Sequence, residues 1–547
     1  MKTNYFNKLS HFYFAFVFAL ISGSISITGC SSEASRNDDI LTENRAAITF
    51  SIGGINETTT VSAPENPSAS ASRTLLALQH KISNLGNNVD AITNAEKVPI
   101  GNSLSPGYTA IASTKMNTYA ATSPMKKDNT FRVLVYNSNN QYVGAIDQAA
   151  GATFVKLDLV KGGDYKWYAY SYNDTSALPD ISAINTANPQ VEARNKDLLY
   201  ASGELINAQV GDNHQKIIFE HVMAKITVII DANSVPANIN AVNDITFNTN
   251  LTQAIFNLKD SPGFVSQGTL SAPYIYTLKE VTAGNSTIKM AEFYTVPLPD
   301  INSFIIKTGT MNIQDFSLPS ANVTPNNSYS FTFPNKVSPT AGTNTNLTIT
   351  LQKGALIGGN FWAVGNLYYD WTATDPKFQY KIRPDSNNRN SGNDVPNKNM
   401  PYSSTDYWAY GAITPDANSL TSTAVNGDLC SLVYPQNTWR MPNNADYEAL
   451  GDTKVNSLSN DGTNAQRNRG TIVTNMATGK QIRFPNDYRN VDELILFSSF
   501  GYYWQSDIWL GSQRKFVTIP VAPPLISPGQ TGSNVSYRLS IRCIRSK

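Results

Sequence analysis

The first thirty residues limit where this chain folds. A start carrying two lysines precedes an apolar stretch at residues 12–27, and Cys30 follows it. This order is typical of an export signal, and the apolar stretch is shorter than the ~20 residues that a membrane-spanning helix needs. We therefore expect the chain to fold outside the cytoplasm. The other two cysteines, Cys430 and Cys543, are then an even pair in an exported chain, and such a pair usually bridges.

Cys30 closes a short motif, Ile-Thr-Gly-Cys at residues 27–30, in which small residues stand directly before the cysteine. The motif resembles a bacterial lipobox. This implies cleavage ahead of Cys30 and a lipid, such as palmitate, on its thiol. Residues 1–29 would then be a signal peptide and residues 30–45 a lipidated tether, with the lipid as the attachment to the outer membrane. The alternative is an ordinary signal peptide with an incidental cysteine.

The composition is that of an exported globular protein. Only 15% of the 547 residues are charged and the net charge is +1, so no surface for nucleic acid or anionic lipid is expected. Tyrosine (27) and phenylalanine (23) are abundant, which favours strands over helices. At about 150 residues per domain, the length predicts about three domains.

Alternating apolar residues predict β-strands in the first half of the chain. In residues 46–53, Ile48, Phe50 and Ile52 alternate with small or polar residues, as in a strand with one buried face. Three later stretches are also predicted as strands, at residues 131–136, 165–172 and 221–231. Connections rich in Asn, Gly and Ser join these stretches. We therefore expect a mainly β protein built of sandwiches, without helical crossovers.

The order of several short motifs resembles the fimbrillins, the lipoprotein pilins of Bacteroidetes. The motifs are a strand soon after the lipobox, a loop carrying an arginine, a Val-Leu-Val-Tyr-Asn strand at 133–137, and two stretches at 197–202 and 219–228. The resemblance covers residues 28–352. It implies two fimbrillin-type β-sandwich domains, at residues 46–231 and 232–352.

The resemblance also implies how the protein would mature. In fimbrillins an arginine-specific protease removes the first strand and opens a groove, which a strand of the next subunit fills. Here the removed strand would be residues 46–53, and the cut would fall between Arg73 and Thr74. Arg45 and Ala46 form the competing site, but a cut there would leave the first strand in place. A missing strand exposes unpaired backbone groups and an apolar slot, and an added strand satisfies both.

The last segment, residues 353–547, differs from the rest in composition, because six of the seven tryptophans lie in it. Three of its stretches stand out, at residues 428–450, 501–506 and 537–545. Together they resemble a C-type-lectin-like module of Bacteroidetes surface proteins. This resemblance implies a C-terminal α+β tip module in which Cys430 and Cys543 bridge.

No residue pattern indicates catalysis. The four histidines are His11, His80, His214 and His221, and none of them lies in residues 353–547, so no Cys/His or Ser/His nucleophile system can be built there. The motif that binds calcium in true lectins is not present as such, and neither a metal nor a cofactor is expected. Most of the tryptophans are expected to fill the core, with a sugar-stacking platform as the alternative.

These features predict a structural and adhesive protein, not an enzyme. A subunit that accepts a strand but has a disulfide-tied C-terminus can only end a fibre, which implies a tip or accessory subunit of a cell-surface fimbrium. Its partners would be other fimbrial subunits, joined by donor-strand exchange, the maturation protease, and a host protein or glycan. The alternatives are a fimbrial anchor that keeps its lipid and a surface glycan-binding lipoprotein. Retention of the N-terminus would identify the anchor, and absence from purified fimbriae would identify the glycan-binding lipoprotein.

Overall fold

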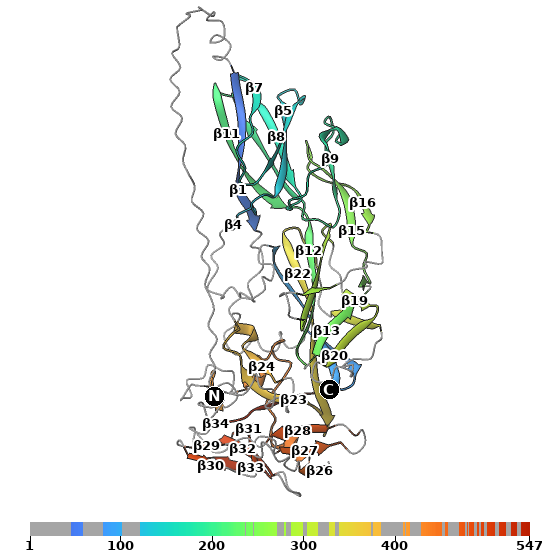
Figure 1. The fold of residues 1–547 in the computed structure, drawn as a ribbon, viewed down its shortest axis with the longest axis vertical. Helices are drawn as coiled ribbons and strands as arrows, with labels where there is room; N and C mark the ends of the chain where they lie inside the picture. The colour runs from blue at the N-terminus through green and yellow to red at the C-terminus, as the bar shows by residue number, and fades with distance from the viewer. Residues whose placement is uncertain are drawn as a thin grey trace, which may run out of the picture.

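The computed structural model shows a mainly β chain in which the sheets follow one another along the longest axis (Figure 1). The residues it describes are 45–57, 80–100, 121–270 except 236 and 244, 278–280, 286–298, 304–315, 328–333, 338–383 except 374–375, 408–415 except 411, 428–450, 454–457, 470–475, 479, 481–485, 489–491, 494–496, 500–508, 514–520, 527–532 and 538–546. None of the helices in these residues has the length and apolar character that crossing a bilayer requires.

The first sheet contains eight strands. In spatial order they are β4 (Ala121–Ser123), β1 (Arg45–Glu57), β11 (Gly211–His221), β10 (Leu199–Leu205), β8 (Tyr165–Ser171), β5 (Thr130–Asn137) and β6 (Tyr142–Ala149), with β7 (Leu157–Val160) paired to β1. The predicted stretches at residues 46–53, 131–136 and 165–172 correspond to β1, β5 and β8. Side chains alternate between the two faces of β5, so Phe131 and Val133 lie in one core, and Leu134 and Tyr136 lie in a second core on the opposite face of the sheet.

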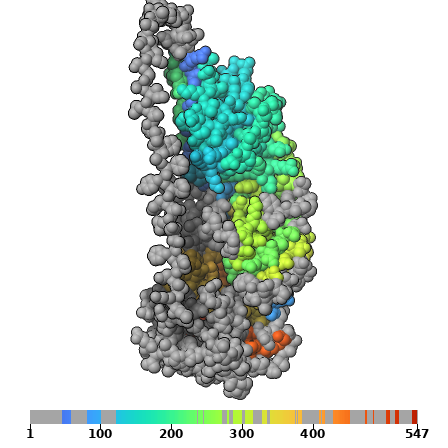
Figure 2. Space-filling view, viewed as in Figure 1, coloured from blue at the N-terminus to red at the C-terminus, as the bar shows by residue number. Residues whose placement is uncertain are grey.

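That opposite face is covered by a small three-stranded sheet. Its strands are β9 (Gln190–Ala193), β15 (Thr252–Asn257) and β16 (Gly263–Thr269). Tyr200 of the first sheet packs against Phe256 of β15, with ring centroids 5.4 Å apart. β9 lies in the chain between β8 and β10 of the first sheet, whereas β15 lies between the segments that form the second sheet. This small sheet therefore links the first sheet to the second. Figure 2 shows the two regions in direct contact.

The second sheet forms one layer of a sandwich. In spatial order its strands are β17 (Lys279–Glu280), β18 (Ile288–Thr295), β12 (Ala224–Ser234), β22 (Thr343–Ile357), β23 (Asn360–Tyr369) and β24 (Tyr380–Ile382). Two strands from the N-terminal part join this sheet: β3 (Val89–Pro99) pairs with β22, and β2 (His80–Gly86) pairs with β3. Opposite it lie β13 (Ala237–Val242) with β20 (Met311–Asp315), and β14 (Thr246–Phe247) with β19 (Phe304–Thr308) and β21 (Tyr329–Phe333). Ile226, Ile349 and Phe331 are fully buried in the core between the layers.

Two segments differ from the expected domain assignment. The strand expected at residues 221–231 as part of the first sandwich is divided. His221 ends β11, whereas β12 lies in the second sheet, antiparallel to β18 and parallel to β22. Residues 80–99, within the range expected for the first sandwich, also join the second sheet through β3. Alternation shows which side chains are buried but not which sheet a strand joins, because pairing partners are distant in sequence.

No linker separates the second sheet from the C-terminal part of the chain. β22 pairs with β3 from Thr343 to Lys353 and then with β23 from Gly354 to Ile357, so the boundary expected at residue 352 lies inside one strand. In the C-terminal part, β35 (Arg542–Ser546) pairs with β23, and the described helices are α3 (Asn444–Glu448) and the short 3-10 helices η3 (Pro376–Phe378) and η6 (Leu429–Leu432). One small sheet contains β25 (Trp408–Ala409), β34 (Arg538–Leu539), β29 (Arg489–Val491) and β30 (Leu494–Leu496). A second contains β26 (Lys454–Ser457), β27 (Gly470–Thr474) and β28 (Gln481–Pro485), and a third contains β31 (Phe500–Ile508), β32 (Arg514–Pro520) and β33 (Ser527–Gly532). They lie at the opposite end of the molecule from the first sheet (Figure 1).

Candidate functional site

The site residues proposed from the sequence fall into three groups, of which the pair Cys430 and Cys543 is described further below. Cys30, Arg73 and Thr74 lie outside the described residues. Arg45 and Ala46, the competing cleavage site, form the start of β1, where Arg45 is exposed and Ala46 is buried. The candidate assembly site is therefore β1 together with the strands and side chains around it.

β1 is paired along both of its edges (Figure 1). On one edge it runs parallel to β11, from Ala46 to Asn56. On the other edge it is antiparallel to β7 near its start and to β4 near its end. Among the strands that the structure describes, β4 and β7 pair with β1 alone. Loss of β1 would therefore unpair one edge of β11 and leave β4 and β7 without a strand partner.

The inward side chains of β1 belong to the core of the first sheet. Ile48 and Phe50 are fully buried, and Ala46 and Ile55 are almost fully buried. The Phe50 ring meets the ring of Trp167 edge to face, with centroids 5.5 Å apart. Burial of a side chain such as Ile48 or Phe50 contributes about 1.5–3 kcal/mol. A chain without β1 would thus expose an apolar slot as well as an unpaired strand edge.

His214 of β11 connects to the outward side of β1. The imidazole Nε2 lies 2.7 Å from the Ser51 hydroxyl oxygen, and Nδ1 lies 3.2 Å from the hydroxyl oxygen of Thr49. The ring of Phe154 packs against the same imidazole, with centroids 5.2 Å apart. Hydrogen bonds of this kind contribute about 0.5–1.5 kcal/mol each. They align β1 with β11, whereas most of the attachment comes from the apolar side chains.

A buried histidine–carboxylate pair stands at the far end of the same strands. The Nδ1 atom of His221, the last residue of β11, lies 2.7 Å from a carboxylate oxygen of Asp197. Burial alone would lower the pKa of His221. The hydrogen bond and charge of Asp197, together with the charges of Glu57 and Glu220, outweigh burial and raise it above its ordinary value. Glu57 is the last residue of β1, so β1 contributes to this charge balance.

This pair predicts a pH dependence of stability. Because the folded-state pKa of His221 is raised, its contribution is fully present below its unfolded pKa of about 6.5 and is lost as the pH rises through the folded value. We expect an Asp197→Asn variant to lose this part of the pH dependence, measured as the urea midpoint of the full chain between about pH 5 and pH 9. A His214→Gln variant is the control and should keep it. An unchanged profile in Asp197→Asn would contradict the assignment.

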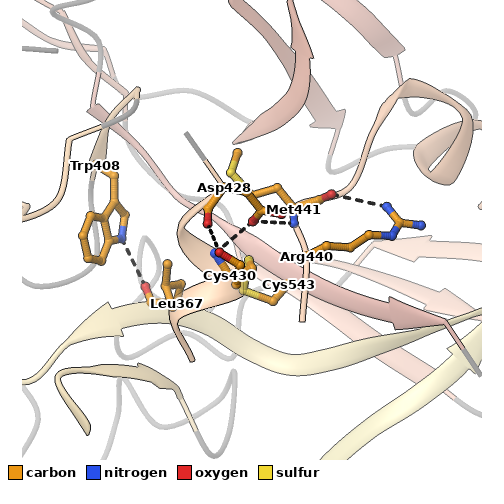
Figure 3. Close-up of a disulfide and its surroundings, with 8 residues drawn as sticks. Leu367, Trp408, Asp428, Cys430, Arg440, Met441 and Cys543 are labelled. Atoms are coloured by element: carbon orange, nitrogen blue, oxygen red, sulfur yellow. Dashed lines mark hydrogen bonds between the residues drawn. A yellow bond between two sulfur atoms is a disulfide. The ribbon is translucent and has the colours of Figure 1, made fainter. Parts of the chain in front are cut away.

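The C-terminal part contains a disulfide between Cys430 and Cys543 (Figure 3). Cys543 lies on β35, so the bond ties the last strand to a residue 113 positions earlier. Asp428 supports the bridge: its Oδ1 atom accepts the backbone N–H of Cys430 at 3.1 Å and that of Met441 at 2.9 Å. Burial raises the pKa of the Asp428 carboxyl, and these donors act against that rise. While the disulfide is intact, β35 stays attached to this part of the chain.

A buried ion pair connects the same strand to the N-terminal half. Arg545 of β35 pairs with Asp90 of β3, and their side chains are only 3% and 8% exposed. The guanidinium also lies over the ring of Phe361, 4.0 Å from its centroid. Asn94 of β3 donates a hydrogen bond to the Tyr434 hydroxyl at 3.0 Å. β3 therefore forms backbone hydrogen bonds with β22, and its side chains bind the C-terminal part through an ion pair and a hydrogen bond.

The tryptophans of the C-terminal part mostly fill its core. Trp362, Trp408, Trp439 and Trp504 are at most 2% exposed, and Trp371 is 49% exposed. The described residues thus offer a single exposed tryptophan there as a stacking surface. Within the same described residues no group of three or more His, Cys, Asp or Glu side chains could hold a metal ion.

Sequence reasoning missed several of these features. Nothing local in the sequence indicated that β1 runs parallel to β11, that β7 covers its other edge, or that Asp90 meets Arg545. The ion pair joins residues 455 positions apart. One weak signal was available, because Asp90 lies between Val89 and Ala91, both fully buried in the core. A charged residue inside a buried strand needs a partner of opposite charge.

Residues 118–362 match the fimbrillin-like family model, a range that begins just before β4 and ends within β23. The match therefore includes strands of both large sheets but neither β1 nor most of the C-terminal part. No curated protein matches this chain.

Solved structures similar to parts of the chain come from Bacteroides, Parabacteroides and Porphyromonas species. A cell-adhesion candidate from Bacteroides fragilis is 12% identical, covers 46% of this chain and 94% of its own, and has a TM-score of 0.27. A fimbrial assembly protein from Parabacteroides distasonis is 9% identical, with coverages of 48% and 96% and a TM-score of 0.22. The fimbrial anchor protein Mfa2 from Porphyromonas gingivalis is 12% identical, with coverages of 41% and 94% and a TM-score of 0.21.

Proposed function

We propose that the protein is a structural and adhesive subunit of a cell-surface fimbrium and that it ends the fibre. The match of residues 118–362 to the fimbrillin-like family supports the fimbrial role. The observation that carries the assembly mechanism is β1, the first described strand, which fills a slot in the first sheet and precedes Arg73 in the chain. No catalytic role is part of the proposal.

Assembly would proceed by exchange of β1 for a strand of a neighbouring subunit. A cut between Arg73 and Thr74 would separate β1 from the rest of the chain. Departure of β1 exposes the slot lined by Trp167 and Phe219 and the unpaired edge of β11. A strand from the neighbour restores both the apolar contacts and the backbone hydrogen bonds, so these interactions favour filling of the emptied slot.

The way in which the last described strand is held supports the proposed terminal position. β35 pairs with β23, carries Cys543 in the disulfide, and places Arg545 in the buried pair with Asp90. Release of β35 as a donor would break the backbone pairing and leave an unpaired charge behind, and such a charge costs several kcal/mol. The subunit would therefore accept a strand without giving one, and this is the reason for proposing that it ends the fibre.

Export and adhesion complete the proposal. Cys30 would carry the lipid of an outer-membrane lipoprotein precursor until the cut at Arg73 frees the mature chain. Residues 353–547 would form a C-type-lectin-like tip module that presents a binding surface to a host protein or glycan. An arginine-specific protease and the other fimbrial subunits are the remaining partners.

Immunogold labelling of intact fimbriae tests the proposed position. We expect antibodies raised against the folded protein to label fibre ends, because a subunit that only accepts a strand cannot be followed by another. Antibodies against a shaft subunit provide the control and should label along the fibre. Label along the whole shaft, or fibres assembled from this protein alone, would contradict the terminal assignment.

A further inference from the structure

We infer that the slot of β1 selects strands that carry an aromatic residue four positions ahead of a glycine. The inference rests on the proposed function, because it concerns the strand that replaces β1. In β1 these two positions are Phe50 and Gly54. The occupant we assign to the slot is an extended segment of another fimbrial subunit, aligned parallel to β11 as β1 is.

The aromatic requirement follows from the depth of the slot. Phe50 is fully buried and meets Trp167, which is itself only 4% exposed. The neighbouring rings of Phe131 and Phe219 also pack edge to face, with centroids 6.2 Å apart. A small residue at the position of Phe50 would leave a cavity against this rigid aromatic wall, and cavities of that size are strongly destabilising.

The glycine requirement follows from a bulge in β1. The register with β11 shifts between Ile52 and Gly54, so the inward set changes from Phe50 before the shift to Ile55 after it. Gly54 has a φ of +139°, a conformation that residues with a side chain rarely adopt. A Cβ atom at this position would also lie 2.8 Å from the backbone oxygen of Ser123 in β4.

The neighbouring Gly53 provides a matched contrast. Its φ lies outside the left-handed region. A Cβ atom there would meet only side-chain atoms: the Cε and Cγ atoms of Lys216 at 2.4 and 2.9 Å and the Cγ1 atom of the exposed Ile218 at 3.1 Å. Lys216 is exposed on β11, and its long side chain can move aside. The slot should therefore be strict at position 54 and tolerant at position 53, although the two glycines are adjacent.

The bulge also explains why the two requirements belong together. A regular strand keeps alternate residues on one face, so a strand without the shift would bury the aromatic residue but turn the position of Ile55 outward. Only a strand with the bulge fills both ends of the slot. The spacing between the aromatic residue and the glycine thus distinguishes a strand that fits the slot from other strands with alternating apolar residues.

Peptide uptake by the cleaved protein tests this selectivity. The full-length chain is cut by an arginine-specific protease, with the cut after Arg73 verified by mass spectrometry. The released N-terminal fragment, which still holds β1 in its slot, is removed by gel filtration in mild denaturant. The emptied protein is then incubated with fluorescent peptides spanning residues 45–57, and the Kd is measured by anisotropy. The peptides are the unchanged sequence and its Phe50→Ala, Gly54→Ala and Gly53→Ala variants. The last adds the same methyl group as Gly54→Ala, one position away.

We expect the unchanged peptide to bind, Phe50→Ala to weaken binding roughly 100-fold or more, and Gly54→Ala roughly tenfold or more. Gly53→Ala should stay within about threefold of the unchanged peptide. If all four peptides bind equally, or if Gly53→Ala and Gly54→Ala weaken binding equally, the proposed selectivity is wrong. Strand exchange itself would not be contradicted by either result. Failure of the unchanged peptide to bind would overturn strand exchange itself, and the selectivity with it.

Discussion

An Arg73→Ala variant is expected to be exported and displayed on the cell but to be missing from assembled fimbriae. Without the cut, β1 stays covalently linked to the chain and keeps Ile48 and Phe50 in the core of the first sheet. A strand from a neighbouring subunit would have to displace a tethered strand, whose effective concentration is in the millimolar range or above for short linkers. Immunoblotting of purified fimbriae and of whole cells measures the effect as a ratio of fibre-bound to total protein.

Arg45→Ala is the matched control for this experiment. Arg45 is the exposed first residue of β1, and a cut beside it would leave β1 in its slot. The variant should therefore enter fimbriae at the wild-type level. If Arg45→Ala is excluded from fimbriae and Arg73→Ala is incorporated, the maturation site is at Arg45, and removal of β1 is not the step that permits assembly.

An Asp90→Ala variant is expected to lower the free energy of unfolding of the C-terminal part by about 3–5 kcal/mol. The substitution leaves the Arg545 guanidinium buried at 3% exposure without its carboxylate. The transition can be followed by tryptophan fluorescence in urea, because six of the seven tryptophans lie in residues 353–547. The variant should begin to unfold in this part of the chain before the sheets of the N-terminal half.

Two further variants separate the ion pair from general effects of substitution. Asp212 pairs with Lys156 on the surface, with both side chains at least half exposed, so Asp212→Ala should cost only about 0–1 kcal/mol. The double variant Asp90→Leu with Arg545→Met removes both charges and should recover much of the stability lost in Asp90→Ala. A cost for Asp90→Ala no larger than that for Asp212→Ala would mean that the pair does not hold β3 to the C-terminal part.

The strands of the first sheet could be predicted because the alternation of apolar and polar residues that indicates a strand lies within a few neighbouring residues. In β1 the alternation of Ile48 and Phe50 with polar neighbours marks one buried face, and the structure places both side chains in the core. The alternation does not indicate the length of the strand. β1 continues past the predicted residue 53 to Glu57, through a glycine bulge that breaks the period.

The partners of the strands could not be predicted, because pairing depends on residues far apart in sequence. β12 has a clear apolar period, but either large sheet offers a core that could bury Ile226 and Val228. β3 has a weaker pattern, with the small residue Ala91 inward and the charged residue Asp90 beside it, and its partner β22 lies some 250 residues away. The contact of Asp90 with Arg545 depends on both pairings and is visible only in the folded chain.

Mass spectrometry of the N-terminal peptide of protein purified from detached fimbriae shows whether this subunit enters the fibre without β1. We expect Thr74 to be the first residue of the fibre-bound chain, which would then contain no residues from 45–57. A fibre-bound chain that begins at a lipid-modified Cys30, or at Ala46, would still contain β1 and would disprove assembly by loss of this strand.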